Sequence, residues 1–460
     1  MPTLPRRALL QAGLALPLAH CAPLALGSAR PALAGQVRDA MRWAWREYRR
    51  LAWGKDEIRP VSGTFSSFPL KDRHLGLSLV EALDTLWLMA LDREFDEAAD
   101  WAEAQLDFDV DGTVSVFETN IRLVGGLLSG WHVSGRPRLL ALARDLADRL
   151  MPAFAASPLG IPHRFVNLKT GAVSGPVTNP AEAGTILPEF GFLSRAVGDD
   201  RYRAAAKRAQ VALFERRSAI GLIPDAIDAT TGEWKSRRAT VGPPSDSYYE
   251  YLWDGWDLLG DRDCRAMYRT MTDAILRHQR RSIGGHRWFV DVDYETGAML
   301  TDEQDELSSF YGGLLGQSGD GAIGGTNVRA WSWLQGEYGI LPEGFKPASG
   351  TVTYKTNALR PELADAAFNL WLLDGREEWR DIVAAHFANM LRWNRAPHGF
   401  TDMADVTAAP KRQADHCPGY WWSEQMKYYW LAFSASPRVD YRRLYLSTEG
   451  NILRGVRRPA

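Results

Sequence analysis

Three acidic residues begin apolar helical patterns at widely separated points of the sequence. Glu118 follows the apolar pair Val116-Phe117, Asp246 precedes an aromatic run, and Glu362 follows Pro361. Acids are common at helix N-termini, where they cap the backbone and interact favourably with the helix dipole. Capping alone explains any one of them. Three such acids beside aromatic and arginine side chains indicate a shared function, because buried acids are costly unless they are used.

Acids that converge on one site are suited to glycoside hydrolysis. One carboxylic acid protonates the departing glycosidic oxygen, while a second carboxylate activates water or attacks the anomeric carbon. The sequence contains no G-x-S-x-G nucleophile elbow, no cluster of His and Cys with metal-ligand spacing, and no glycine-rich phosphate loop between a strand and a helix. Glycoside hydrolysis is therefore the chemistry that these residues favour.

The elements that carry these acids are predicted from apolar residues at three- and four-residue spacing. Fourteen helical blocks follow residue 35, separated by Gly, Pro and Asp turns. Short joints such as 196–200 and 373–376 connect successive helices as antiparallel hairpins do. The predicted blocks are 36–52, 75–91, 94–107, 118–133, 137–153, 181–197, 200–214, 246–259, 262–281, 305–317, 324–338, 361–374, 377–392 and 420–434.

Seven helical hairpins without a fixed sequence period favour a ring that closes on itself over an open solenoid. Alternate helices then lie inside the ring, and the helix starts that carry the three acids meet at one end. Strand-like segments at 221–225 and 288–293 predict short β-hairpins on one rim, where loops commonly shape a site. We therefore expect an all-α fold in which residues 35–460 form a single domain.

Composition restricts the possible partners. The 460 residues carry a formal net charge of −2, are 45% hydrophobic and 24% charged, and are typical of a soluble globular protein. Near-neutral charge argues against nucleic acid as a partner, and no stretch after residue 35 is long and apolar enough for a membrane helix. The 18 Trp residues are either sugar-binding platforms or packing in the core. The three cysteines, Cys21, Cys264 and Cys417, cannot form a disulfide framework.

Residues 1–34 are predicted to be an export signal. Arg6-Arg7 precedes a short apolar run that ends near Leu18, and the small-x-small site Ala32-Leu33-Ala34 follows. The paired arginines suggest the twin-arginine route. The segment that ends at Cys21 weakly resembles a lipoprotein box, but His20 stands where a small residue is needed. We expect a periplasmic or secreted protein.

Several motifs, in order along most of the chain, resemble those of glycoside hydrolase family 47, the class I α-1,2-mannosidases. This resemblance is far more specific than any single motif, because it extends over roughly residues 72–450. The motifs are Leu79 to Trp87, Phe117 to Arg122 followed by Gly125 to Ser129, Ala181 to Thr185 with Glu189-Phe190, Asp246 to Tyr251, Arg360-Pro361-Glu362, Ser423 to Tyr428, and Ser447-Thr448-Glu449.

The resemblance implies an (α/α)7 barrel with a C-terminal hairpin that plugs it. It also implies a calcium-dependent exo-hydrolase that removes terminal α-1,2-linked mannose with inversion. Glu118 would be the general acid and Glu362 the general base. Asp246 would be a third acid that positions the water, or the base itself. Thr448 would bind Ca²⁺ through its hydroxyl and carbonyl oxygens.

Further motif residues are expected to contact the sugar or calcium-bound waters, and their arginines to hold the acids ionised and oriented. These residues are Asp84, Arg122, Glu182, Glu189, Arg360, Glu424 and Glu449. The residues Tyr420, Trp421 and Trp422 are either aromatic walls for the sugar or packing. The expected partner is a mannose-containing oligosaccharide or glycan, bound by a monomer.

The sequence also departs from the family pattern. Gly450-Asn451-Ile452 replaces a common Ala-His-Pro, and Glu306 stands where many members have His. Pro244 replaces an arginine of branch-selective members, so strict branch choice is not predicted. Two other functions stay open: a lectin-like member that binds mannose glycans without hydrolysis, and another (α/α) toroid enzyme such as a glucosidase, lyase or epimerase.

Overall fold

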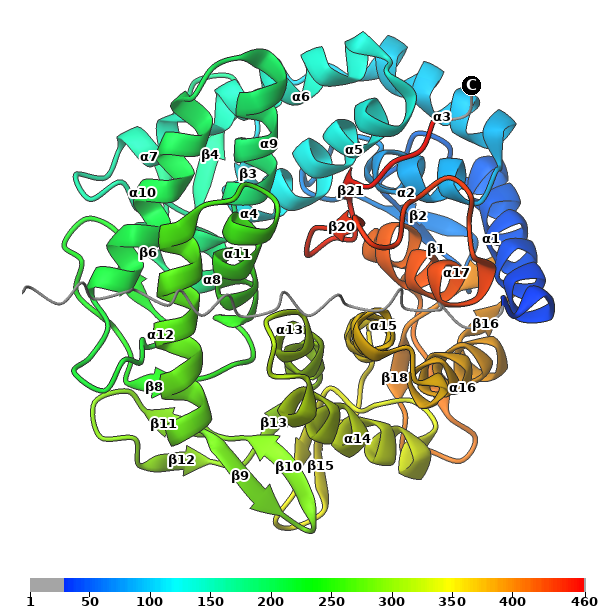
Figure 1. Cartoon of the computed structure of the whole chain (residues 1–460). Coiled ribbons are helices and arrows are strands. Elements are labelled where there is room, and N and C mark those ends of the chain that lie inside the picture. Colours follow the sequence, from blue (N-terminus) through cyan, green and yellow to red (C-terminus); the bar gives the residue numbers. More distant parts are fainter. Residues whose placement is uncertain (1–28, 459–460) are drawn as a thin grey trace, which may run out of the picture.

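The computed structural model describes residues 29–458, which form two concentric rings of helices (Figure 1). The inner ring consists of α2 (Leu77–Leu88), α4 (Val116–Glu118) continued by the π-helix η1 (Thr119–Val124) and α5 (Gly125–Ser134), α8 (Pro180–Gly184) with α9 (Leu187–Val197), α11 (Asp246–Asp257), the 3₁₀-helix η2 (Glu306–Phe310) with α13 (Tyr311–Gln317), α15 (Glu362–Asp374), and the π-helix η3 (Trp421–Gln425) with α17 (Met426–Ser434). The outer ring consists of α1 (Pro31–Leu51), α3 (Asp92–Gln105), α6 (Pro137–Leu150) with the short α7 (Pro152–Ala155), α10 (Arg201–Glu215), α12 (Arg262–His278), α14 (Gly321–Tyr338) and α16 (Glu377–Trp393).

Within the described residues the two rings pair as seven hairpins, and this confirms the predicted (α/α)7 barrel. Each predicted block coincides with one of these helices or composite helices. The predicted joints are also present. Gly198 and Gly375 adopt positive φ values of 70° and 69° directly after α9 and α15, a conformation that glycine adopts without steric cost.

The two rings differ in sequence because they differ in environment. Every residue of α2 is buried, since an inner helix contacts both its ring neighbours and the plug. The outer helix α1 buries one stripe, whose spacing follows the helical period and which is formed by Ala34, Val37, Ala40, Met41, Ala44, Trp45 and Tyr48. These two helices therefore differ in how much of their surface is buried.

Short strands occupy the connections that lead from an outer helix to the next inner helix. These strands are β1 (Glu57–Arg59), β2 (Thr64–Ser66), β3 (Thr113–Ser115), β4 (Phe165–Asn167), β5 (Val173–Ser174), β6 (Val177–Thr178), β7 (Ile227–Asp228), β8 (Arg238–Ala239), β9 (Arg280–Ile283), β10 (His286–Phe289), β11 (Asp291–Asp293), β12 (Met299–Thr301), β13 (Gln304–Asp305), β14 (Gly344–Lys346), β15 (Thr351–Tyr354), β16 (Arg395–Ala396), β17 (Gly399–Phe400), β18 (Met403–Asp405) and β19 (Arg412–Gln413). All of them precede an inner helix, so they lie at the end of the barrel where the inner helices begin. The three acids belong to the same end.

The last strands, β20 (Tyr445–Leu446) and β21 (Ile452–Arg454), form the antiparallel hairpin that was predicted to plug the barrel. This C-terminal hairpin lies inside the ring against α5 (Figure 1). Its turn is tight, because the Gly450 N–H donates to the Ser447 carbonyl at 2.7 Å and Gly450 has φ of 69°. The Asn451 side chain donates to the carbonyl of Ile121 at 2.9 Å.

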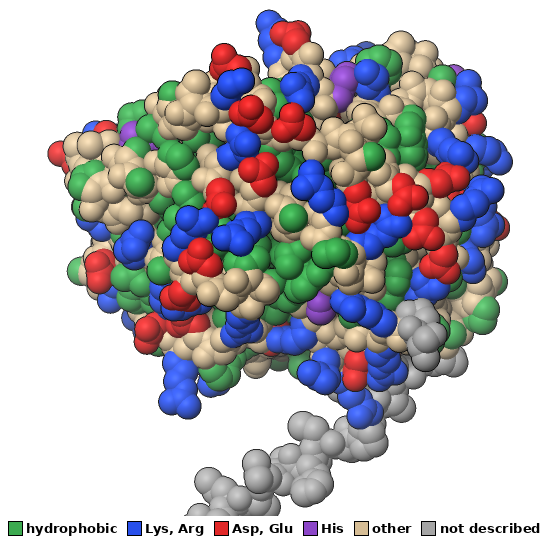
Figure 2. Space-filling model, turned by 90° about the horizontal axis from the view of Figure 1, so that it is seen from above, with side chains coloured by type: hydrophobic (Ala, Val, Ile, Leu, Met, Phe, Trp, Pro, Cys, Tyr) green, Lys and Arg blue, Asp and Glu red, His purple; other side chains and the backbone are tan. Residues whose placement is uncertain are grey.

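On the face shown in Figure 2, basic and acidic side chains are interspersed, as the small net charge suggests. No helix within residues 29–458 is both long and apolar enough to cross a bilayer. Residues 1–28, with Cys21, lie outside the described residues, and the predicted cleavage site after Ala34 falls in the first turn of α1. Cys264 and Cys417 are free and buried.

Candidate active site

A cavity of about 350 Å³ opens inside the barrel where the inner helices begin. Eight carboxylic residues and two arginines line it, so the cavity is strongly acidic in character. The acids are Glu118, Glu182, Asp246, Glu250, Glu362, Asp365, Glu424 and Glu449, and the arginines are Arg122 and Arg360. The structure therefore brings together the three acids from three distant inner helices, as the ring model predicted.

Glu118 and Arg122 lie on a helix that is widened by a π-helical segment. Ser115 caps the start of this helix by accepting from the Glu118 N–H at 3.3 Å. One turn later, Nε of Arg122 donates to Glu118 at 2.7 Å. π-Helical turns inside α-helices are frequent at functional sites, because they turn side chains out of the regular register.

Arg122 also donates to two further acids and so fixes the position of Glu118. Its second nitrogen lies 3.1 Å from Glu81 and 2.9 Å from Glu449 of the C-terminal hairpin. Burial and repulsion from Glu449 raise the pKa of Glu81, although Arg122 opposes this. One guanidinium thus joins α2, the π-helical segment and the hairpin at the wall of the cavity.

Asp246 and Glu362 are the first residues of their helices and are half-buried in the cavity wall. Burial raises the pKa of Asp246 to about 6 and that of Glu362 to about 7, and the positive charge of Arg360 opposes both shifts. Arg360 itself is held by Glu343, with nitrogen–oxygen distances of 3.0 and 3.3 Å. Raised pKa values in a cavity are typical of acid–base residues.

Thr448 and Glu449 reach the cavity from the turn of the C-terminal hairpin. Thr448 hydrogen-bonds with Glu250. Burial and the nearby charge of Asp365 raise the pKa of Glu250 to about 8. Among the described residues, no three His, Cys, Asp or Glu side chains are placed to hold a metal directly. Hard oxygen donors that repel one another nevertheless suit a divalent cation such as Ca²⁺, which accepts hydroxyl, carbonyl and water ligands.

The structure separates the other predicted sugar-contacting residues into two groups. Glu182, Glu424 and Glu449 line the cavity with Arg122 and Arg360. Asp84 and Glu189 are fully buried behind the wall and are not among its lining residues. Glu189 accepts from Tyr251 at 2.6 Å and from Asn120 at 3.0 Å, whereas Glu182 pairs with Arg164.

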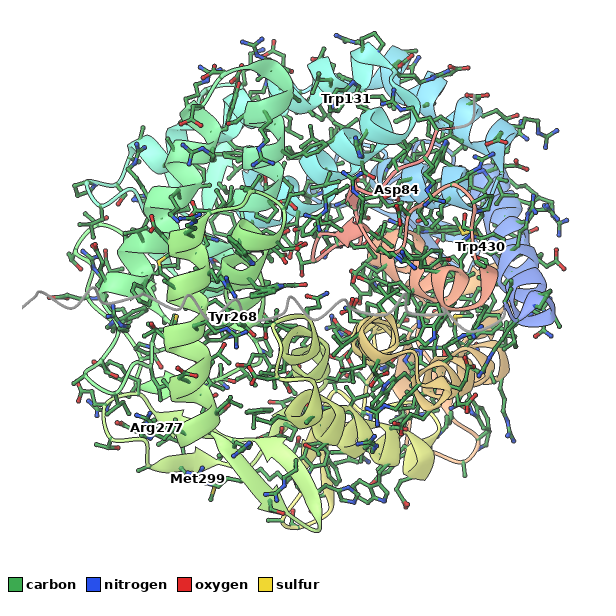
Figure 3. The ribbon with its side chains drawn as sticks, viewed as in Figure 1. Asp84, Trp131, Tyr268, Arg277, Met299 and Trp430 are labelled. Carbon is green, nitrogen blue, oxygen red and sulfur yellow. The ribbon has the colours of Figure 1, made fainter. Side chains whose placement is uncertain are left out.

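Asp84 stabilises the C-terminal hairpin through contacts with Lys427 and with the backbone of Ile452. It lies on α2 next to that hairpin, where Figure 3 labels it. Lys427 lies 2.6 Å from its carboxylate, and the Ile452 N–H donates to it at 2.8 Å. Lys427 also donates to the carbonyl of Gly450. Asp84 thus connects two inner helices to the hairpin that carries Thr448.

The three aromatic residues at the start of η3 have different environments. Tyr420 lines the cavity, and the guanidinium carbons of Arg122 and Arg360 lie 5.4 and 5.7 Å from its ring centre. Trp421 and Trp422 are at most 1% exposed and pack in the core, with Trp421 stacked on Phe400 at 5.2 Å. The sequence alone left both environments open for all three.

Sequence reasoning assigned no role to several acids that the structure places at or near the cavity. Glu250 and Asp365 lie one turn after Asp246 and Glu362, and this i, i+4 and i, i+3 spacing was a usable signal. Glu81 lies in the first recognised motif but had no distinguishing neighbour. Glu343 lies in a loop far from any motif, so no local signal identified it.

The comparisons identify the family. Residues 40–455 match the model of glycosyl hydrolase family 47, and the chain belongs to this family of glycoside hydrolases. It is 31% identical to alpha-mannosidase I MNS4 of Arabidopsis thaliana over 424 residues, which cover 86% of this chain and 66% of that protein. It is 32% identical to mannosyl-oligosaccharide 1,2-alpha-mannosidase MNS1 of the same plant, over 88% of this chain and 75% of that one. The chain thus spans about two thirds to three quarters of these two relatives.

Two solved structures are similar to this one in fold. The structure of an alpha-1,2-mannosidase from Trichoderma reesei superposes with a TM-score of 0.85 at 24% identity, covering 94% of this chain and all of that one. The structure of cellobiose 2-epimerase from Bacillus thermoamylovorans superposes with a TM-score of 0.53 at 11% identity, over 88% of this chain and 99% of that one. Both similarities concern the fold.

Proposed function

We propose that this protein is a calcium-dependent, inverting exo-α-1,2-mannosidase that removes terminal α-1,2-linked mannose from mannosides or high-mannose glycans. The observation that carries the proposal is that Glu118, Asp246 and Glu362, from three distant inner helices, line one cavity. Two relatives that the chain resembles over most of its length are named as α-mannosidases. The C-terminal hairpin lies inside the barrel and its Thr448 and Glu449 line the cavity. A hairpin that fills the barrel on one side of the cavity favours exo action.

In the proposed mechanism Glu118 donates a proton to the departing glycosidic oxygen. Glu362 accepts a proton from the water that attacks the anomeric carbon on the opposite face, so that β-mannose is released. Asp246 positions that water. Thr448, assisted by waters held near Glu424 and Glu449, would hold Ca²⁺, which when bound orients the sugar hydroxyls and neutralises the acidic cavity.

One difference supports Glu362 rather than Asp246 as the base. Each carboxylate interacts with the backbone N–H of its own residue at the helix start. Asp246 also accepts from the Ser247 N–H at 2.9 Å and from the Ser247 side chain. The Oε2 atom of Glu362 is buried and has no donor among the described residues other than the neighbouring Glu306. A carboxylate held by more donors is better suited to hold a water than to take its proton.

Proton NMR with α-1,2-mannobiose tests the proposal. The purified protein is incubated with the disaccharide after EDTA treatment, and again after addition of Ca²⁺. We expect β-mannose to appear first, and only when Ca²⁺ is present. Initial α-mannose would exclude inversion, and equal rates with EDTA would exclude the metal requirement.

The alternative is a lectin-like protein that binds mannose glycans without hydrolysis. The presence of an acid and a candidate base in one cavity favours the enzyme, because binding alone does not need both. No release of mannose under any metal condition, with the disaccharide still bound, would favour the lectin-like function.

We further propose that the protein acts as a monomer in the periplasm or outside the cell. The basic, apolar and small-residue order of residues 1–34 supports export. N-terminal sequencing of protein recovered from a periplasmic fraction tests the export, and size-exclusion chromatography with light scattering tests the monomer. Full-length protein confined to the cytoplasm would contradict the first proposal, and a mass of twice the chain the second.

A further inference from the structure

A fully buried acid that the proposed mechanism does not use lies beside the proposed base. Glu306 begins η2, directly after β13, and its side chain is 0% exposed. Its backbone N–H donates to the Glu343 carbonyl at 3.0 Å, which fixes the residue at the start of the helix. η2 packs against α15, the helix that begins with Glu362.

The carboxyl groups of Glu306 and Glu362 face each other. Both carboxyl oxygens of Glu306 and the Oε2 atom of Glu362 are buried. None of these three oxygens accepts a hydrogen bond from an N–H or hydroxyl group of the described residues. The two side chains lie within hydrogen-bonding reach of each other. Two carboxyl groups can bond in this way only when one of them carries a proton.

The charges around the pair determine which carboxyl keeps the proton. Arg360 is the cation that faces both groups, while the carboxylates of Glu343 and Asp305 also face Glu306. Burial and repulsion from Glu362 raise the pKa of Glu306 well above its usual value. Tyr420 also lies close to Arg360 and Glu362.

Exposure to water also favours ionisation of Glu362. Glu362 opens to the water of the cavity, but Glu306 does not. A charge is therefore less costly on Glu362 than on Glu306.

We propose that Glu306 is a positioning residue for the base, holding its proton and donating it in a hydrogen bond to Oε2 of Glu362. This bond keeps the Glu362 carboxylate ionised and leaves its other oxygen to accept from the attacking water. The inference rests on the proposed function of Glu362, and it assigns to Glu306 a role in the reaction without contact to substrate.

Paired variants test the proposal through the pH profile of kcat/KM. In Glu306→Gln the amide still donates to Glu362, so we expect the acidic limb to stay where the wild type has it. In Glu306→Leu the donor is lost, so the acidic limb should move upward by about one to two pH units. This is the shift in the pKa of Glu362 that corresponds to the loss of one hydrogen bond to a charged group. The rate below the limb should then fall about tenfold to a hundredfold. Equal limbs in the two variants would overturn the proposal, as would loss of all activity in Glu306→Gln, which would show that Glu306 acts in its ionised form.

An infrared measurement decides the same question without activity. The band of a protonated carboxylic acid at neutral pH should be stronger in the wild type than in Glu306→Gln, and the difference spectrum isolates this one group. No difference would show that Glu306 is ionised, and it would overturn the proposal even if Glu306→Leu does not fold. If the wild type is inactive but shows the band, the proposed function is contradicted, whereas the proton that Glu306 shares with Glu362 is still supported.

Discussion

Arg122 determines how the proposed acid is held, because it donates to acids from three parts of the fold. Its bonds to Glu118, Glu81 and Glu449 give one geometry to side chains that are separated by up to several hundred residues in sequence. Such charge-assisted bonds are directional, and they are shielded here from most solvent. The acid is therefore oriented before a sugar arrives.

Substitution of Glu118 separates catalysis from binding. In Glu118→Gln we expect kcat to fall about 10²- to 10⁴-fold, because the amide cannot donate the proton that the leaving oxygen requires. The dissociation constant for α-1,2-mannobiose, measured by calorimetry, should change only a few-fold, since Gln retains the shape and the contact with Arg122. Unchanged turnover in this variant would remove Glu118 from the reaction.

Variants of the other two acids identify the base. We expect Glu362→Gln to reduce kcat/KM more than Asp246→Asn does, and to abolish the acidic limb of the pH profile. The raised pKa of Glu362, about 7, means that activity is lost as the pH falls through that value, because the protonated carboxyl cannot accept a proton from water. The opposite ranking would assign the base to Asp246.

At the residue scale, the sequence predicted which acids meet but not which of them touch the cavity. Asp84 and Glu189 lie in motifs just as Glu118 does, yet they are buried behind the wall. A motif indicates that a residue type is required at a position. It does not distinguish a residue that lines the cavity from one that supports the cavity wall. Glu306 and Glu343 show the converse, because their importance depends on contacts between distant segments.

At the element scale, the C-terminal hairpin is held by a buried ion pair. Lys427 and Asp84 are at most 1% exposed and lie 2.6 Å apart. We expect Asp84→Asn to lower the free energy of unfolding by about 3–5 kcal/mol, because it leaves the Lys427 charge buried without its partner. Urea denaturation measures this change.

The matched control for this pair is Asp92→Asn on the outer helix α3. Asp92 pairs with Arg438 at 2.6 Å but is 58% exposed, so we expect a loss of less than about 1 kcal/mol. If both variants lose the same free energy, burial of the pair is not what stabilises the hairpin. If Asp84→Asn also weakens the response to Ca²⁺, the hairpin connects the ion pair to Thr448.

At the scale of the whole molecule, the fold could be predicted because its elements are separated clearly in the sequence. Gly198 and Gly375 end inner helices, and the outer helix α1 carries an apolar stripe while the inner helix α2 is buried throughout. The π-helical segments at 119–124 and 421–425 could not be predicted. They keep the apolar spacing of α-helices approximately, and only tertiary contacts at the cavity select the wider turn.

The same acidic interior makes the stability of the whole molecule depend on pH. Glu189 is fully buried, and burial raises its pKa to about 8 despite its bonds to Tyr251 and Asn120. A carboxyl whose pKa is higher in the folded state stabilises the fold fully below its unfolded pKa, and this contribution is lost as the pH rises toward the folded pKa. Between pH 5 and 8, in calcium-free buffer, the free energy of unfolding should therefore fall, and Glu189 should account for about 1.4 kcal/mol per pH unit.

Glu189→Gln tests this dependence, because the amide does not titrate. We expect urea denaturation at pH 5, 6.5 and 8 to show a smaller fall in the free energy of unfolding than in the wild type. Asp92→Asn is the control, since Arg438 lowers the pKa of Asp92 and its contribution is therefore lost only in acid. The same slope in wild type and Glu189→Gln would show that Glu189 is ionised in the folded protein, and that its bonds to Tyr251 and Asn120 outweigh the cost of burial.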